Sequence, residues 1–335
     1  MPSGTAAQRA LFLGGALLLL GVTFGLSLWV GARTLDAAEV WRVLWHPDGS
    51  EAAFIVREMR LPRSLLALVV GMALGVAGAL IQALTRNPLA DTGILGVGAG
   101  ASFAVVVGVA FFGATALSQY MWFAFGGAIA VTVLVYTLGS IGSIGATPVR
   151  LTLVGVALGA LLGGFTSAIT MLHPDSFSDV LRWSAGSLAG RGWDTLGAVL
   201  APIALGLLIG LVSGRPLNAV SLGDDVARSL GASVLRTRIL VIVAVTLLAG
   251  AAAAAAGPVG FVGLMVPHIV RWFTGPDQRW IIPFSAVGAA LLLLAADVLG
   301  RVLLAPRELE VGIVTAFIGA PVLIALARRR NVSAL

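Results

Sequence analysis

The sequence contains no cysteine and no lysine among its 335 residues. Without cysteine it forms neither disulfides nor a thiolate nucleophile or metal ligand. All 21 basic residues are arginine, so the chain cannot form a Schiff base. It also lacks the lysine that a Walker A loop places on nucleotide phosphates. Any ATP chemistry associated with this protein must therefore belong to another chain.

Charge is scarce as well. Only 11% of the residues are charged, 59% are hydrophobic, and the mean hydropathy is +1.02, which leaves too few polar residues to cover a soluble globule. Because a span needs roughly 20 apolar residues, the sequence predicts an all-α integral membrane protein of about ten transmembrane helices in a single domain, 1–335. The expected spans are 10–30, 61–84, 94–112, 117–138, 151–172, 195–212, 239–256, 259–270, 280–299 and 311–327.

Two of these spans need an argument about length. The first has an apolar core of about 20 residues, longer than the roughly 7 to 15 of a signal peptide, so we expect a retained helix. The eighth has only 12 uncharged residues, 259–270, between Pro258 and Arg271. At about 1.5 Å per residue it covers about 18 Å of a core about 30 Å thick. A short or partly re-entrant helix of this kind requires protein around it.

The segment 215–231, RPLNAVSLGDDVARSLG, is a polar interruption that itself looks helical. Asp224 and Asp225 come near a helix start and Arg228 later, as the helix dipole favours. The apolar residues between them predict an amphipathic helix at the membrane surface. Its residues alone leave two interpretations open: a solvated loop helix, or a docking element for a soluble partner. The arginines here and at 328–330 favour the cytoplasm for this loop and for both termini.

Several blocks of the sequence resemble the FecCD-type permease family, the membrane subunits of ABC importers for iron siderophores, haem and cobalamin. The similarity runs from about Arg60 to Arg330 and includes RLPRSLLALVVG, ALTRNPLADTGILGVGAGASF, SLGDDVARSLG, GPVGFVGLMVPHIVRWFTGPDQRW, LLLAADVLGRVL and ELEVGIVTAFIGAP. PVRLTLVGVAL, RWSAGSLAGR, GPDQRW and ELEVG most resemble the ferric enterobactin and siderophore permease branch.

The resemblance implies a transport subunit, not an enzyme, in the bacterial cytoplasmic (inner) membrane. Its partners would be a second permease subunit, identical or paralogous, two ABC ATPase subunits that hold ATP and Mg, and a periplasmic or lipid-anchored siderophore-binding protein. Membrane lipid would surround it, and neither a cofactor of its own nor a nucleic acid is expected. The implied cargo is a ferric siderophore, with the catecholate type favoured. Haem or cobalamin is the alternative within the family, and an ion-coupled secondary transporter is the alternative of another class.

The resemblance also assigns residues to roles. Coupling to the ATPase falls to Leu222, Gly223, Asp224, Asp225, Ala227, Arg228, Leu230 and Gly231. Docking of the binding protein, through exposed pairs with its glutamates, falls to Arg60, Arg63 and Arg301, although Arg301 also lies four residues from Asp297 and could pair with it internally. The cytoplasmic gate is matched by Asn87, Leu89, Pro148 and Val149. No catalytic residue or metal site is expected, because His268 has no neighbouring ligand in the sequence and is better explained by packing.

Overall fold

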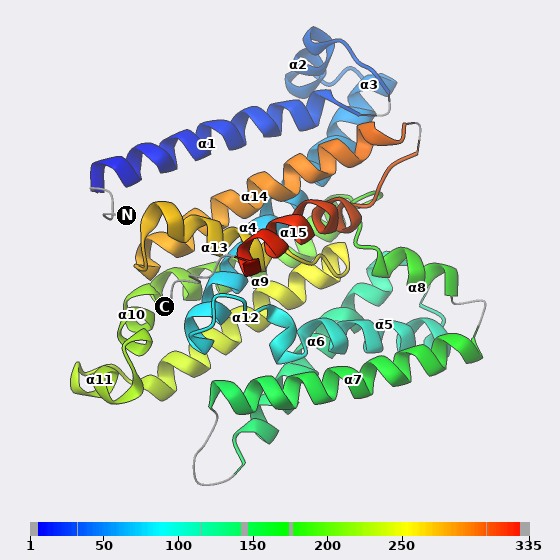
Figure 1. The fold of residues 1–335 in the computed structure, drawn as a ribbon. Coiled ribbons are helices and arrows are strands. Elements are labelled where there is room, and N and C mark those ends of the chain that lie inside the picture. The colour runs from blue at the N-terminus through cyan, green and yellow to red at the C-terminus, as the bar shows by residue number, and fades with distance from the viewer. Residues whose placement is uncertain are drawn as a thin grey trace.

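The computed structural model describes residues 6–31, 33–114, 116–141, 147–173, 177–305 and 307–328, and every regular element within them is helical (Figure 1). The all-α fold is therefore confirmed. The elements are α1 (Ala6–Trp29), α2 (Ala37–Trp45), α3 (Glu51–Phe54), the π-helical stretch η1 (Ile55–Arg60), α4 (Leu61–Thr85), the 3₁₀ turn η2 (Thr92–Leu95), α5 (Val97–Phe112), α6 (Leu117–Gly139), α7 (Pro148–Leu172), α8 (Phe177–Ser184), α9 (Trp193–Val212), α10 (Gly214–Ser221), α11 (Asp224–Ser229), α12 (Val234–Ala256), α13 (Val262–Thr274), α14 (Gln278–Leu303) and α15 (Val311–Arg328).

Among the described residues, 7 helices are long and apolar enough to cross a membrane. They are α1, the continuous helix of α3, η1 and α4, then α6, α7, α9, α12 and α14. α5 and α15 are apolar but shorter, and α13 has only 13 residues. The count of ten spans therefore remains a prediction.

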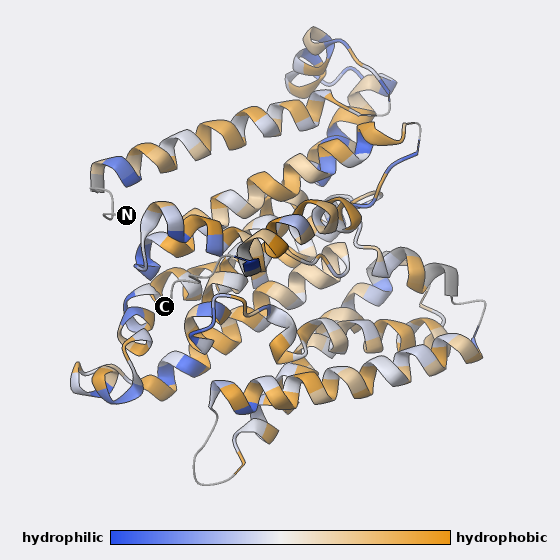
Figure 2. Cartoon of the chain, viewed as in Figure 1, coloured by the Kyte–Doolittle hydropathy of each residue, from blue (hydrophilic) through white to orange (hydrophobic). Residues whose placement is uncertain are grey.

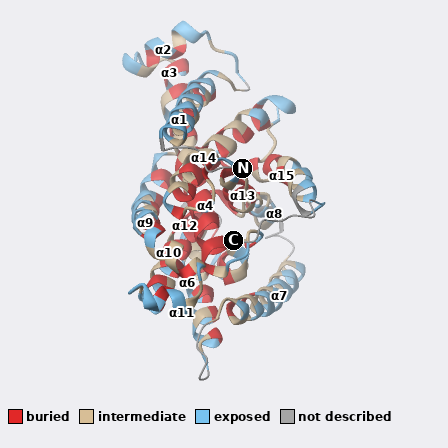
Figure 3. Ribbon diagram, turned by 60° about the vertical axis from the view of Figure 1, so that its left-hand side comes forward, coloured by how far each residue is buried: buried red, intermediate tan, exposed pale blue. Residues whose placement is uncertain are grey.

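Helix α4 forms the centre of the bundle, where the buried residues gather (Figure 3). It packs against α14, α13, α12 and α9. Glycines make the closest contacts possible, since a Cβ on Gly75 would lie 2.2 Å from the Ser285 carbonyl oxygen and one on Gly78 would lie 1.8 Å from that of Gly263. Small residues let helix backbones approach in this way where no water is present to drive association.

The helix that contains α4 begins earlier than the sequence predicts. It starts at Glu51, where the Ser50 hydroxyl accepts a hydrogen bond from the Ala53 amide at 3.2 Å, and runs for 35 residues to Thr85. The expected span from Leu61 lies wholly within this helix, which adds ten residues, among them the charged Arg57 and Glu58, before it. A helix can continue beyond the hydrocarbon core, where polar side chains reach water.

The short eighth element is present as α13, and protein surrounds its first turn. The Gln82 side-chain amide, from α4, donates hydrogen bonds to the carbonyl oxygens of Gly263 at 3.3 Å and Leu264 at 3.1 Å. Arg271 belongs to the last turn of α13 rather than following it, and donates to the Gln82 side-chain oxygen at 2.7 Å. The Gln82 side chain of α4 thus forms hydrogen bonds with backbone and side-chain groups of a helix that is too short to cross a membrane alone.

Hydrophilic residues gather at two opposite ends of the bundle (Figure 2). α10, α11 and the start of α1 lie at one end, called here the α11 end, while α2, α3 and the loop between α14 and α15 lie at the other, the α2 end (Figure 1). This arrangement agrees with the predicted placement of the 215–231 segment and the start of the first span on one side of a membrane. The assignment of the α11 end to the cytoplasm remains a prediction.

Candidate coupling surface and arginine network

The 215–231 segment forms two short helices, α10 and α11, instead of the single helix predicted. The break falls at Leu222 and Gly223, where Gly223 has a φ of 113°. Glycine adopts this backbone conformation far more readily than other residues. The turn changes the direction of the chain, so the faces of α10 and α11 cannot be read from one helical wheel.

The outer face of α11 is an apolar strip. It is made of Leu222, before the Gly223 turn, Val226, within α11, and Leu230, just after its last residue, and 63%, 44% and 63% of their surfaces are exposed. Beside them, the Asp225 carboxylate accepts a hydrogen bond from Arg228 at 3.0 Å in an ion pair open to solvent. The sequence did predict these residue types, but it did not predict that the apolar side would face away from the protein. An exposed strip with charged neighbours suits a protein partner.

The inner face of α11 is held by one small apolar contact and one ionic joint. Ala227 is fully buried against Val220 and Val234. The Asp224 carboxylate accepts hydrogen bonds from Arg86 at 2.6 Å and Arg238 at 2.7 Å. Asp224 therefore differs from Asp225: it attaches α11 to the end of α4 and the start of α12 rather than facing outward.

The ionic joint is maintained by charge. Burial raises the pKa of Asp224, but the Arg86 hydrogen bond and the charges of Arg238 and Arg86 outweigh burial and hold the pKa below its usual value. Arg86 also donates to the Val220 carbonyl oxygen at 3.0 and 2.6 Å. Arg86 thus connects the end of α4 with both α10 and α11.

A second polar joint connects α10 with the start of α14. The Asn218 side-chain amide donates to Asp277 at 2.7 Å, and its oxygen accepts from the Gln278 backbone at 2.8 Å. Hydrogen bonds from Arg279 and then Asn218 lower the pKa of Asp277 to about 2. Polar contacts thus join α10 and α11 to the end of α4, the start of α12 and the start of α14.

The sequence analysis missed Arg86, Arg238, Asn218 and Asp277. Asp277 carries a local signal, since an aspartate just before a helix commonly caps it, and here it accepts from the Arg279 amide at 3.0 Å. No local signal identifies the pairing of Arg86 with Asp224, because 138 positions separate them.

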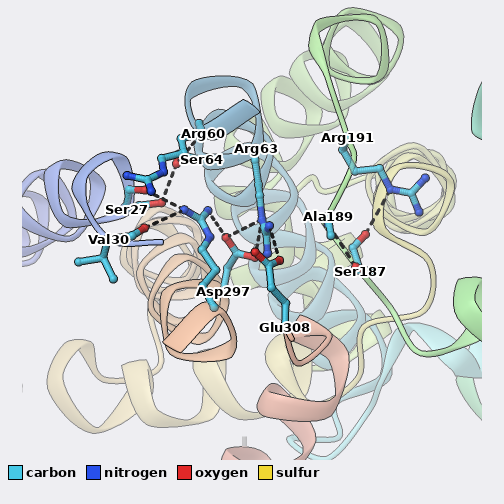
Figure 4. A network of polar contacts seen from close by, with 11 residues as sticks. Ser27, Val30, Arg60, Arg63, Ser64, Ser187, Ala189, Arg191, Asp297 and Glu308 are labelled. Atoms are coloured by element: carbon cyan, nitrogen blue, oxygen red, sulfur yellow. Dashed lines mark hydrogen bonds and ion pairs between the residues drawn. The ribbon is translucent and has the colours of Figure 1, made fainter. Parts of the chain in front are cut away.

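At the α2 end, the arginines assigned to partner docking form an internal network (Figure 4). Arg63 donates to Asp297 at 3.0 and 2.8 Å and to Glu308 at 2.6 Å. Asp297 also pairs with Arg301, as its spacing of four residues allows. One carboxylate thus joins two guanidinium groups, and Glu308, whose side chain is 29% exposed, covers the outer side of Arg63.

The other bonds of this network hold the end of α1. Arg60 donates to the carbonyl oxygens of Leu28 at 3.0 Å and Trp29 at 2.6 Å, and Arg301 donates to that of Ser27 at 2.8 Å. Arg60 is 6% exposed and Arg301 2%. The expectation of exposed docking arginines is therefore corrected, because both side chains satisfy carbonyl groups and a carboxylate inside this chain. The alternative internal pairing of Arg301 with Asp297 is the observed one.

The predicted gate residues lie in two segments next to α4 and α7. Asn87 caps the turn after α4, where its side-chain oxygen accepts from the Leu89 amide at 3.0 Å, and both residues are exposed. Pro148 is the first residue of α7, and Val149 is 68% exposed. Within the described ranges no hydrogen bond joins the Asn87–Leu89 pair to the Pro148–Val149 pair, so their joint action as a gate stays a prediction.

Metal binding and ion-coupled transport have little support in the described part of the chain. No group of three or more His, Asp or Glu residues there could hold a metal ion. His268 packs edge-on against Trp272 with ring centroids 5.9 Å apart. Asp297 is engaged by Arg63 and Arg301, so it is not a free carboxylate of the kind that couples transport to an ion gradient.

Comparison with known proteins gives a consistent result. A model of the FecCD transport family matches residues 18–329. The chain is 47% identical over 331 residues to the ferric enterobactin transport system permease protein FepD of Escherichia coli (strain K12), with 99% of each chain covered. It is 38% identical over 330 residues to the hemin transport system permease protein HmuU of Yersinia pestis, with 97% of each covered. A solved inward-facing structure described as a metal-chelate type ABC transporter matches with a TM-score of 0.83 at 28% identity, covering 96% of this chain and 99% of that one.

Proposed function

The chain belongs to the FecCD transport family, and from that premise we propose that it is the membrane-spanning permease subunit of an ATP-driven importer of iron chelates. A ferric siderophore of the catecholate type is the favoured cargo, because the chain is more similar to the ferric enterobactin permease than to the hemin permease. Haem or cobalamin is the alternative. The work of transport is done by partner ATPases that hold ATP and Mg.

Coupling through α10 and α11 is the mechanistic part of the proposal. The observation that supports it is the exposed strip of Leu222, Val226 and Leu230 on a helix pair attached by polar joints to three spans. An ATPase that grips the strip would pull on Asp224 and Asn218, and through them on α4, α12 and α14. The transmembrane part then alternates between outward and inward openings.

Copurification tests the coupling surface. Leu222→Ala combined with Leu230→Ala removes apolar area that a partner would bury, so we expect at least about a tenfold loss of bound ATPase. Leu304→Ala is the matched control, since Leu304 is 55% exposed at the opposite end. Equal retention of the ATPase by all the variants would contradict the assignment.

Docking of a binding protein at the α2 end remains part of the proposal, in a modified form. Glu308 occupies the outer side of Arg63, as a glutamate of a partner would. A docking carboxylate would then compete with Glu308 rather than meet a free arginine. Glu308→Gln should strengthen capture of the loaded binding protein at low salt, while Glu310→Gln on the same loop should not. Weaker capture by Glu308→Gln would argue against this exchange.

A second permease subunit is supported by α7. Leu151 and Gly155 are its buried residues, and most of its remaining apolar surface is open. In Figure 3 it lies at the edge of the molecule. The chain has no cysteine, so a cysteine at Val156 or Phe165 can be paired with single cysteines placed along the neighbouring permease. Added oxidant then joins the two thiols in a disulfide where the subunits touch. Cross-links to an identical or paralogous permease are expected, and none at either position would contradict an α7 interface.

The whole proposal is tested in vesicles. The permease alone should accumulate no ferric enterobactin, and addition of its ATPase, binding protein and ATP should produce uptake. Accumulation by the permease alone would overturn the ATP-driven mechanism. Uptake of hemin in preference to ferric enterobactin would replace the cargo but keep the mechanism.

A further inference from the structure

A cavity of about 540 Å³ lies at the α11 end, between the end of α9, α10 and the start of α12, and Leu230 at the end of the exposed strip borders it. Two arginines, Arg215 on α10 and Arg236 on α12, line it together with Ser213, Ser233 and Thr237. None of its lining residues is acidic. The volume falls within the range of about 300–1,000 Å³ that small-molecule sites occupy.

Both arginines are available to a ligand. Arg215 and Arg236 are exposed, and neither makes a hydrogen bond or ion pair within the residues that the structure describes. Their neighbours differ: Arg238, two positions further along, pairs with Asp224. Two unpaired cations beside hydroxyl groups, with no carboxylate in the lining, form a site for an anion with several acceptor oxygens, such as a phosphate.

The surface next to the cavity is apolar and belongs to helices long enough to span a membrane. Arg236, Ile239 and Val243 recur at helical spacing on one side of α12, and Ile239 and Val243 are 43% and 42% exposed. Val212, which lines the cavity from α9, is 63% exposed. Figure 2 shows the hydrophilic start of α12 giving way to hydrophobic residues along the helix. The anion site thus lies where the polar end of the bundle meets its hydrocarbon-facing surface.

An apolar groove continues this surface along α12. It has a volume of about 260 Å³ and is formed by α6 and α12, with Ile239, Val243 and Ile129 among its lining residues. An acyl chain could lie in such a groove because its lining is almost wholly apolar. A protein partner reaching the cavity from the aqueous side would leave this groove unused, so the combination favours a lipid over a protein carboxylate.

We propose that the cavity between α9, α10 and α12 binds the headgroup phosphate of an anionic phospholipid, through Arg215 and Arg236, with an acyl chain against α12. The inference rests on the membrane-spanning fold and not on the proposed transport function. Because the cavity is lined by α10, a bound lipid would restrict the movement of α10, which leads directly into the strip of Leu222, Val226 and Leu230.

The test is displacement of fluorescent phosphatidylglycerol from the full chain in a nonionic detergent. Unlabelled phosphatidylglycerol should compete, whereas phosphatidylcholine and inorganic phosphate should compete at least about tenfold less well. Arg215→Gln and Arg236→Gln should each weaken binding about fivefold, as expected for one basic residue near an anionic lipid surface. Arg236→Lys should bind nearly as the parent does, because it keeps the charge.

Arg42→Gln is the matched control, since Arg42 is an exposed arginine on α2 at the opposite end. Melting temperatures establish that each variant is folded. Comparing Arg236→Lys with Arg236→Gln separates the loss of charge from the change of side chain at one position. Equal competition by inorganic phosphate would mean a free-anion site and would overturn the proposal. So would unchanged lipid affinity in both glutamine variants, or a loss of bound ATPase in them without any loss of lipid.

Discussion

Replacing Asp224 by Asn removes the charge that attaches α11 to α4 and α12. The Asp224 side chain is 28% exposed and receives two hydrogen bonds from arginines. Exposed ion pairs contribute about 0.2–1 kcal/mol and hydrogen bonds to charged groups about 1.5–3 kcal/mol. For this partly exposed joint we expect a loss of about 1–2 kcal/mol, which acts on the attachment of α11 rather than on the folding of the bundle.

Hydrogen exchange measures this loss directly. A local opening made easier by about 1–2 kcal/mol exchanges about 5- to 30-fold faster, and the change should appear in the amides of 224–230. Asp225→Asn is the matched control, because its carboxylate is almost fully exposed and, among the residues that the structure describes, pairs with Arg228 alone. Exchange that is no faster in Asp224→Asn than in Asp225→Asn would refute the joint. If the joint transmits force, ATPase stimulation should fall in the first variant even where the ATPase still binds.

The pH dependence of the joint follows from the sign of the shift. The pKa of Asp224 is lowered in the folded protein, so its stabilising contribution is complete above the ordinary aspartate pKa of about 3.9 and is lost as the pH falls through the lower, folded value. The slow exchange of 224–230 should therefore persist at neutral and mildly acidic pH. Faster exchange already between pH 7 and 5 would show that another group controls the attachment.

Three other perturbations test different parts of the structure. Asp297→Asn leaves Arg63 and Arg301 without their shared buried charge and should lower the free energy of unfolding by about 3–5 kcal/mol, seen as a lower melting temperature. Glu308→Gln should lower it much less, because Glu308 is partly exposed. Similar losses of stability in the two variants would contradict the central role of Asp297. Gly78→Ala places a Cβ 1.8 Å from the Gly263 carbonyl oxygen and should destabilise the bundle by about 1–3 kcal/mol. Gly98→Ala should not, because a Cβ at Gly98 would meet no atom within 4 Å. Equal melting temperatures of the two variants would refute the close contact. Asp277→Asn should speed amide hydrogen exchange in α10, because it weakens the contact with Asn218. Since the pKa of Asp277 is about 2 in the folded protein, this contact should stay intact in the parent down to about pH 2. Loss of protection near pH 4 in the parent would contradict the role given to Asp277.

Both successful and failed predictions for the 215–231 segment have physical reasons. Its composition correctly indicated short helical structure outside the spans, because charged residues cannot lie in the hydrocarbon core. It did not indicate that Asp224 and Asp225 have opposite orientations. That difference depends on Arg86 and Arg238, which reach Asp224 from other helices.

The arginine network likewise has one feature that the sequence could predict and one that it could not. The spacing of Asp297 and Arg301 allowed their pairing to be considered from the sequence, since residues four apart share a helix face. The burial of Arg60 and Arg301 depends on the carbonyl groups at the end of α1, which lie far away in the chain. A guanidinium group looks the same in the sequence whether it meets solvent or carbonyl oxygens.

By itself, the sequence determined that this is a helical membrane protein and which family it resembles, because composition and local motifs are properties of the chain alone. Its lack of lysine predicted that nucleotide chemistry belongs to a partner. Only the tertiary structure decided which charges are paired, that the apolar side of α11 faces outward, and that Arg215 and Arg236 line one cavity. The reason is physical: an ion pair or a cavity depends on distances between segments, and those distances exist only once the helices have packed.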